Sequence, residues 1–242
     1  MVDLKNEPQS AIDAHGIIGD MRSAALVNDK GSIDFFCWPE FDSPSIFCSL
    51  LDSPDAGIFQ LTPDLPNARR EQIYLPDTNV LQTRWLSERA VVEVTDLLPI
   101  GDSEDDLPVL MRRVRVVSGR ATFHMRCAVR HDYARADTRA QMDQQDVTFS
   151  ASGQPTLRLA SDQPMQIDKQ AAVAQFTLKQ DETAAFMLGA EGAWVGTAFL
   201  ATHEAGIEDF QKEAIVDGGD LIVLKFQHPL YGLTNRGVVL GN

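Results

Sequence analysis

The chain has 242 residues, 44% of them hydrophobic, which is enough to bury a sizeable core and excludes global disorder. Its 21 basic and 35 acidic side chains give a formal net charge of −14, which disfavours nucleic acid and anionic membranes as partners. No stretch approaches the roughly 20 apolar residues of a membrane span, and the first residues lack the apolar run of a signal peptide.

The three cysteines, Cys37, Cys48 and Cys127, are odd in number and contain no Cys-x-x-Cys pair. Free, buried thiols in a reducing compartment are the simplest interpretation of this pattern. We therefore expect a cytoplasmic protein without disulfides.

Short segments with apolar side chains at every second position recur from about residue 20 to residue 190, as expected of half-buried strands. Compact turn signals separate them, for example at 28–31, 87–89, 152–155 and 180–182. The predicted strands are 23–27, 33–37, 58–61, 80–86, 91–97, 110–117, 121–130, 147–150, 157–160, 174–178 and 184–188. Many short strands joined by tight turns predict an all-β fold, a large antiparallel β-sandwich.

The clearest alternation lies in 121–130, where one face carries Ala121, Phe123, Met125, Cys127 and Val129. The preceding segment, 110–117, has a noisier version of the same pattern. Because Ser118 and Gly119 form a turn signal between the two segments, we expect them to pair as an antiparallel hairpin.

Two segments favour helices instead. Residues 43–52 have apolar side chains at helical spacing, with Asp42 or Ser43 as the cap and Pro44 in the first turn. Residues 204–215 place Ile207, Phe210 and Ala214 on one helical face, which predicts a C-terminal helix.

Several blocks in the first 135 residues occur in an order that points to a known family. They are Gly16 to Asp20, Gly31-Ser32-Ile33-Asp34, Pro39-Glu40-Phe41-Asp42-Ser43, Tyr74 to Leu81, Val94 to Pro99 and Arg130 to Arg135. Together they resemble the trehalase-like N-terminal domain of bacterial glycoside hydrolase family 15 proteins, the glucoamylase-like enzymes and trehalases. The resemblance covers about residues 12–200.

This resemblance implies a galactose-mutarotase-like super-sandwich, followed in the family by a linker helix and an (α/α)6 barrel. In the family the barrel carries two glutamates that hydrolyse an α-glucosidic bond with inversion, which requires carboxylates about 6.5–9.5 Å apart. No segment of this chain resembles the barrel motifs. We expect a β-sandwich domain over 1–203, a linker helix and divergent tail over 204–242, and the function of a non-catalytic accessory domain that packs on the absent barrel.

Residues 214–242 have no counterpart in the family pattern. They fit an extra strand, the product of a truncated or frameshifted gene, or a different fused element. The apolar run 221–224 would suit an edge or swapped strand, and a sandwich without its partner domain would bury the orphaned surface by forming a homodimer.

The loop containing Trp38, Pro39, Phe41, Asp42 and Ser43 is the candidate site. An exposed Trp38 beside Phe41 would suit a domain interface or the rim of a sugar site, and core or turn packing is the third interpretation. The acidic residues Asp34, Glu40 and Asp42 could form an acid/base pair, although a turn role for Asp34 and a cap role for Asp42 are the simpler explanation.

Other chemistries find little support. His124, His131 and Asp132 match no zinc-ligand spacing, so we expect ordinary histidines and neither a metal nor a cofactor. A phosphate-binding loop and a Gly-x-Ser-x-Gly nucleophile motif are both missing from the sequence, and a sugar epimerase has no matching motif. The alternative function is a freestanding carbohydrate-binding or sensing module that uses Trp38, Trp85 or Trp194, with α-glucosides as possible ligands.

Overall fold

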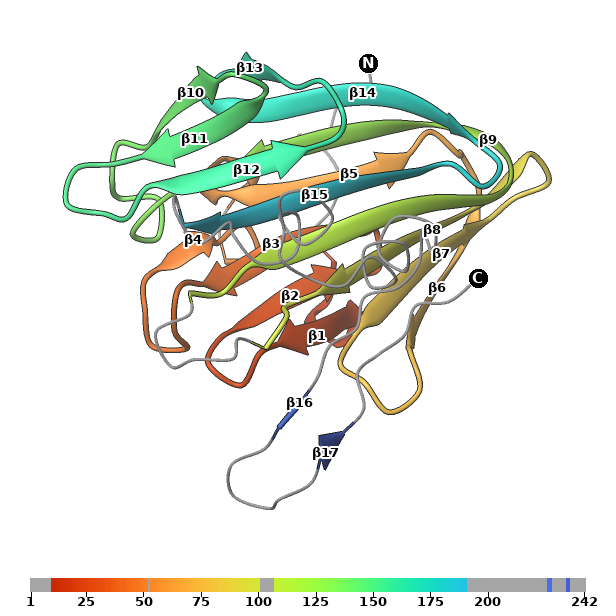
Figure 1. Ribbon diagram of the computed structural model, residues 1–242, viewed down its shortest axis with the longest axis horizontal. Helices are drawn as coiled ribbons and strands as arrows, with labels where there is room; N and C mark the ends of the chain where they lie inside the picture. The colour runs from red at the N-terminus through yellow and green to blue at the C-terminus, as the bar shows by residue number, and fades with distance from the viewer. Residues whose placement is uncertain (1–9, 52, 101–106, 191–225, 228–233, 236–242) are drawn as a thin grey trace, which may run out of the picture.

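The computed structural model describes residues 10–51, 53–100 and 107–190, together with 226–227 and 234–235 (Figure 1). Within these ranges the regular secondary structure is almost entirely antiparallel strand, which confirms the predicted all-β class. Two short 3₁₀ helices, Ile12–Ala14 and Pro54–Ala56, are the helical segments of the described part. None of the helices described there is long and apolar enough to cross a membrane.

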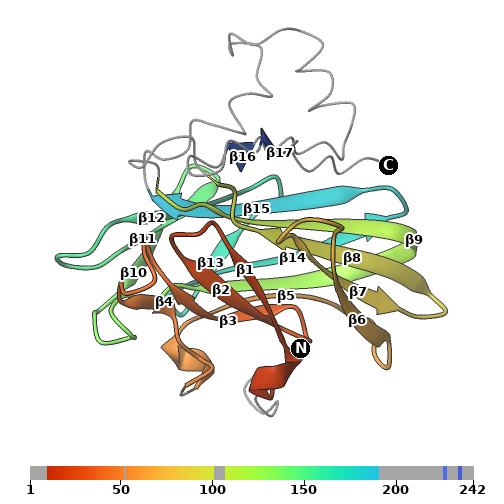
Figure 2. The same cartoon turned by 90° about the horizontal axis from the view of Figure 1, so that it is seen from below.

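The strands form two layers that lie one over the other (Figures 1 and 2). The first sheet has the order β1-β2-β3-β5-β9-β14-β13, with β4 paired to β3. Its strands are β1 (His15–Gly19), β2 (Ala24–Asn28), β3 (Ser32–Cys37), β4 (Ser45–Phe47), β5 (Ile58–Pro63), β13 (Gln166–Asp168) and β14 (Ala171–Lys179).

The second sheet has the order β6-β7-β8-β9-β15-β12-β11-β10. Its strands are β6 (Arg69–Tyr74), β7 (Leu81–Leu86), β8 (Ala90–Leu97), β10 (Arg139–Asp143), β11 (Asp146–Ser150), β12 (Leu157–Ser161) and β15 (Thr183–Ala190). A separate short ladder joins β16 (Phe226–Gln227) to β17 (Thr234–Asn235). The predicted helix over 204–215 and the apolar run 221–224 lie outside the described residues.

Strand β9 (Leu110–Ala128) belongs to both sheets, so the predicted 110–117/121–130 hairpin is wrong. Its first half pairs with β8 and β15, and its second half pairs with β5 and β14. The chain changes layer at Gly119, where φ is +80° and a Cβ would lie 2.1 Å from the Arg89 carbonyl oxygen. Buried side chains are even-numbered before this bend and odd-numbered after it, so that both halves face the core between the sheets.

The helix predicted over 43–52 is also wrong, because β4 occupies Ser45–Phe47. All three residues of β4 are buried, and Ile46 accepts a hydrogen bond from the Arg130 N–H. A short apolar run fits a buried strand as well as a helix, and pairing with β3 decided between them. Leu51, which the helical pattern would bury, is 69% exposed.

A chain of phenylalanine rings fills the core between the sheets. The ring of Phe59 on β5 contacts Phe47 and, in an edge-on arrangement, Phe186 on β15, with centroids 6.2 and 6.3 Å away. Phe186 also contacts Phe176 on β14, which stacks on Phe123. These contacts cross from one sheet to the other and bury large apolar areas, the main source of stability for the sandwich.

Candidate functional site

The predicted site loop between β3 and β4 contains a buried tryptophan. Trp38 is 5% exposed, and its indole N–H donates to the Pro108 carbonyl oxygen at 3.0 Å, so the expected exposure of Trp38 is wrong. The peptide bond between Trp38 and Pro39 is cis. A backbone bond from the Trp38 N–H to the Pro44 carbonyl closes the loop, which turns the indole inward.

Phe41 is the aromatic side chain that this loop exposes. Its ring is 60% exposed, while its backbone N–H donates to the Arg22 carbonyl oxygen at 2.9 Å. Asp42 is exposed, and Pro39 and Ser43 are half-buried. Ser43 Oγ accepts a hydrogen bond from the Glu40 N–H, so it stabilises the turn and leaves Phe41 at the tip.

Four large apolar side chains are exposed on segments that are joined to one another at this end of the sandwich. They are Met21 (66%), Phe41 (60%), Leu107 (38%) and Tyr133 (38%). Hydrogen bonds link Phe41 to Arg22, and Tyr133 to Ser45, while the Trp38 indole links to Pro108. We call this end of the sandwich, with its four exposed side chains, the exit end, because β15 also ends here, at Ala190, on the left of Figure 1. Gly189, next to the last residue of β15, packs against Val109 and Pro108.

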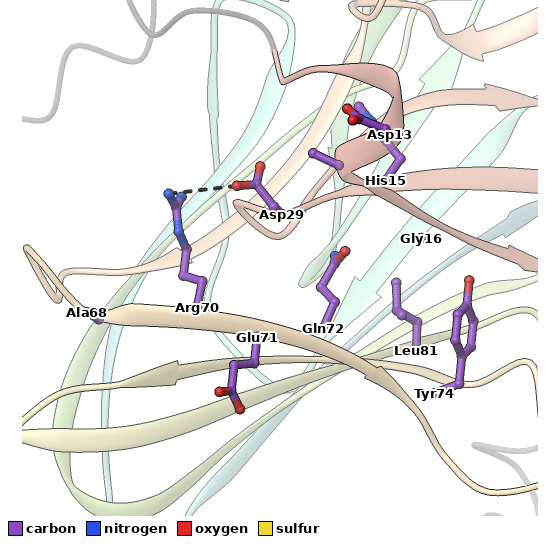
Figure 3. Close-up of a pocket in the computed structure, with 11 residues that line it drawn as sticks. Asp13, His15, Gly16, Asp29, Ala68, Arg70, Glu71, Gln72, Tyr74 and Leu81 are labelled. Atoms are coloured by element: carbon purple, nitrogen blue, oxygen red, sulfur yellow. Dashed lines mark ion pairs between the residues drawn. The ribbon is translucent and has the colours of Figure 1, made fainter.

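A polar pocket of about 510 Å³ lies at the opposite end, between the start of β1 and strand β6 (Figure 3). Arg70, Gln72 and Tyr74 point from β6 toward β1, whereas Glu71 points away. Asp13 and Asp29 contribute carboxylates from the segment before β1 and from the β2–β3 turn. The sequence did not predict this pocket, because β6 has no apolar alternation that would identify it as a strand.

Gly16 on β1 and Leu81 on β7 both line the pocket. A Cβ at Gly16 would lie 2.5 Å from one methyl carbon of Leu81 and 2.9 Å from the other, so β1 approaches β7 there without a side chain between them. Tyr74 ties β6 to β1, since its hydroxyl accepts from the Ile17 N–H at 2.7 Å and donates to the Ile17 carbonyl at 2.9 Å. The Gln72 amide N–H₂ donates to the Asn28 carbonyl at 2.9 Å.

The three acidic residues of the predicted acid/base cluster are not brought together. Asp34, buried in β3, accepts hydrogen bonds from His15 Nε2 at 2.9 Å and from Asn28 at 2.9 Å. Glu40 lies in the exposed loop and pairs with Arg22 at 3.6 Å. Asp42 has no helix to cap within the described part of this loop. Asp34 and Glu40 therefore serve local structure, although the predicted turn role of Asp34 is wrong because this residue lies inside β3.

The histidines form no metal site in the described ranges, where no three His, Cys, Asp or Glu side chains gather. His131 is buried, accepts at Nδ1 from the Thr138 hydroxyl and donates from Nε2 to the Pro155 carbonyl. Burial lowers the pKa of His131, and the bond to Pro155 opposes that shift. His124 is half-buried on β9.

The cysteines are free and buried, as predicted. Burial raises the pKa of the Cys127 thiol, and burial together with the neighbouring Cys48 raises the pKa of Cys37. A raised pKa keeps the thiols of Cys37 and Cys127 protonated, so these two residues have packing roles and are poor nucleophiles.

Residues 3–212 match the family model described as "Trehalase-like, N-terminal". The chain belongs to this family. A trehalase of Mycobacterium tuberculosis is 28% identical over 205 residues, covering 74% of this chain and 29% of that protein. A trehalase of Mycolicibacterium smegmatis is 34% identical over 151 residues, covering 54% of this chain and 22% of the relative. Trehalase 1 of Sulfolobus acidocaldarius is 41% identical over 100 residues, with coverages of 41% and 16%. The chain spans less than a third of the length of these curated relatives.

Three of the motif blocks of this trehalase-like N-terminal domain contribute residues that hold the fold together. Asp96 and Arg112 form a fully buried bidentate pair, with N–O distances of 2.8 and 3.1 Å. Arg112 also donates to the carbonyl oxygens of Phe59 and Gly31 at 2.6 and 2.7 Å, so one guanidinium ties the second sheet to the first. Asp20 caps the β1–β2 turn by accepting from the Ser23 N–H at 2.7 Å.

Proposed function

We propose that this chain is the non-catalytic accessory domain of a glycoside hydrolase family 15 type enzyme that acts on α-glucosides, and that the exit end packs on its catalytic barrel. The single observation that carries the proposal is spatial. The polypeptide leaves the last sandwich strand at Ala190 beside Pro108 and Val109, at the end where Met21, Phe41, Leu107 and Tyr133 are exposed. In longer relatives the remaining chain would follow from this end.

The chemistry of the exit end suits a domain interface better than an active site. The four exposed side chains of this end are hydrocarbon or aromatic, whereas Asp34 is buried against His15 and Glu40 is paired with Arg22. Apolar side chains that gather on neighbouring loops stabilise a complex when a partner covers them. In this proposal Phe41 and Tyr133 contact the barrel, while buried Trp38 fixes the loop that presents Phe41. Free, buried Cys37, Cys48 and Cys127 favour the cytoplasm as the compartment.

The first test is hydrolysis by the purified chain. We expect no release of glucose from trehalose, maltose or dextrins above a buffer control, because in this family the two catalytic glutamates lie in the barrel and no segment of this chain resembles the barrel motifs. Enzyme-like turnover by the chain alone would overturn the accessory role.

The second test is a chimera in which this sandwich replaces the matching segment of the Mycobacterium tuberculosis trehalase. We expect Phe41→Ser with Tyr133→Ser to lower its thermal stability and trehalose hydrolysis. Met142→Ser is the matched control, since Met142 is 43% exposed but lies on β10, outside the exit end. Equal effects of the two variants would show that the exit end is not the interface.

Two of the three tryptophans on which the alternative function relies, Trp38 and Trp85, are buried. Trp38 and Trp85 are 5% and 4% exposed, so neither indole can offer its face to a sugar ring. Trp194 lies outside the described residues.

A further inference from the structure

We infer that the pocket between β1 and β6 is a binding site for a neutral, polyhydroxylated molecule, a saccharide or polyol of up to disaccharide size. This goes beyond the accessory role, since it assigns a ligand to the end of the sandwich away from the proposed domain interface. Strand β1 runs from His15, which lines the pocket, to Gly19, which does not, and none of the four exit-end side chains lines the pocket. The volume of about 510 Å³ falls within the roughly 300–1,000 Å³ of small-molecule sites.

The pocket combines two free acceptor groups with a guanidinium that makes one long ion pair. Asp13 is exposed and has no hydrogen bond or ion pair among the described residues. The side-chain N–H₂ group of Gln72 donates to backbone carbonyl oxygens and to the Thr83 hydroxyl. The side-chain carbonyl oxygen of Gln72 has no hydrogen-bond partner among the described residues. Arg70 has a long contact of 3.8 Å to Asp29, and both side chains are about 40% exposed, at 40% and 42%. A hydroxyl group both donates and accepts, so it can bridge such a carboxylate and guanidinium.

The charges of the pocket select against ionic ligands. Two carboxylates, Asp13 and Asp29, face one guanidinium, Arg70, on a chain of net charge −14, which disfavours phosphates and carboxylates. His15 adds no free positive group, because its two ring nitrogens face the Ala11 carbonyl and the Asp34 carboxylate. The guanidinium in turn disfavours a metal cation between the two carboxylates.

The walls supply rigidity and an apolar surface. Tyr74 is 47% exposed, and its ring stands beside Leu81 while its hydroxyl is held by both backbone groups of Ile17 (Figure 3). A ring fixed in this way can pack against the C–H face of a sugar with little loss of side-chain freedom. Gly16 lets β1 pack directly on Leu81, because a side chain at this position would collide with Leu81.

The test is a titration of the full chain with glucose, trehalose, maltose and myo-inositol, followed through backbone amide signals by NMR. We expect saturable shifts at Gly16, Asp29 and Ala68. Arg70→Gln should weaken binding roughly tenfold, the effect of losing one charge-assisted hydrogen bond. Arg69→Gln is the matched control and should change affinity less than about twofold, because Arg69 pairs with Glu71 on the opposite face of β6.

Three results would overturn the assignment. The first is the absence of shifts with all four compounds, and the second is shifts that map to the exit end. The third is tighter binding of glucose 6-phosphate or of Ca²⁺ than of the neutral compounds. Each of these leaves the accessory role untouched, since that role is tested by hydrolysis and by the chimera. Conversely, a chimera in which the two serine variants have no effect would leave the interpretation of the amide shifts at Gly16 unchanged.

Discussion

The two ends of the sandwich treat their exposed aromatic side chains in opposite ways. At the pocket end, the Tyr74 hydroxyl bonds both backbone groups of Ile17 and closes the edge of β1 against β6. At the exit end, Phe41 and Tyr133 bond neighbouring segments through their backbone N–H groups, and the exposed Tyr133 ring carries the Arg135 guanidinium, 5.2 Å from its centroid. The exposure of an aromatic ring alone therefore does not identify an interface. An exposed ring that the domain uses for its own closure differs from one that is left for a partner.

The largest effect is expected at the buried Asp96–Arg112 pair, which ties both sheets together. Arg112→Met should cost about 3–5 kcal/mol, because it leaves Asp96 charged, buried and unpaired. Urea unfolding followed by tryptophan fluorescence measures this loss. Arg120→Met, at an exposed position of the same strand, should stay within about 0.5 kcal/mol. If the two variants unfold at the same urea concentration, the buried pair does not hold the sheets together.

Trp38 and Phe41 sharpen the comparison within the exit end itself. Trp38→Ala should cost about 3–5 kcal/mol through a buried cavity and the lost bond to Pro108. Phe41→Ala should leave the stability of the isolated chain within about 0.5 kcal/mol, since its ring is mostly in solvent. Thermal unfolding of both variants separates them. A large loss for Phe41→Ala would mean that the ring belongs to the sandwich and is not reserved for a partner.

Removing the Tyr74 hydroxyl tests the closure of the pocket end. Tyr74→Phe should cost about 1 kcal/mol and speed hydrogen exchange at the Ile17 amide, which loses its acceptor. The Leu26 amide on the neighbouring strand β2 serves as an internal control. Unchanged exchange at Ile17 would show that the β1 edge is protected by something other than this hydroxyl.

The smallest effect concerns pH and the loop that carries Tyr133. The pKa of His131 is lowered in the folded state, mainly by burial, so the unfolded state binds the proton first as pH falls. Stability should therefore be complete above the unfolded pKa of about 6.5 and decline below it. His131→Gln should flatten this decline between about pH 7.5 and 5.5 in urea titrations. An equally steep decline in the variant would assign the pH dependence to other groups.

The sequence predicted much of the strand content, because period-two burial is a local property. The turns at 28–31, 87–89, 152–155 and 180–182 lie where the strands end, since small and polar residues mark tight turns. Within the sandwich, the sequence did not predict β1, β4, β6, β10 and β13. Of these, β6 has polar side chains on both faces and becomes a strand through pairing with β7. The pocket was missed with it.

The sequence by itself determined the all-β class, the family and the absence of disulfides, because alternation, motif order and cysteine count do not depend on which strands meet. Only the tertiary structure decided that residues 110–128 form one strand shared by two sheets, since turn residues at Ser118 and Gly119 suit a hairpin and a layer change equally well. It also decided that Trp38 points inward and Phe41 outward. Two aromatic residues three positions apart look alike in sequence, and it is the distant Pro108 carbonyl that takes the indole N–H and leaves the phenyl ring in solvent.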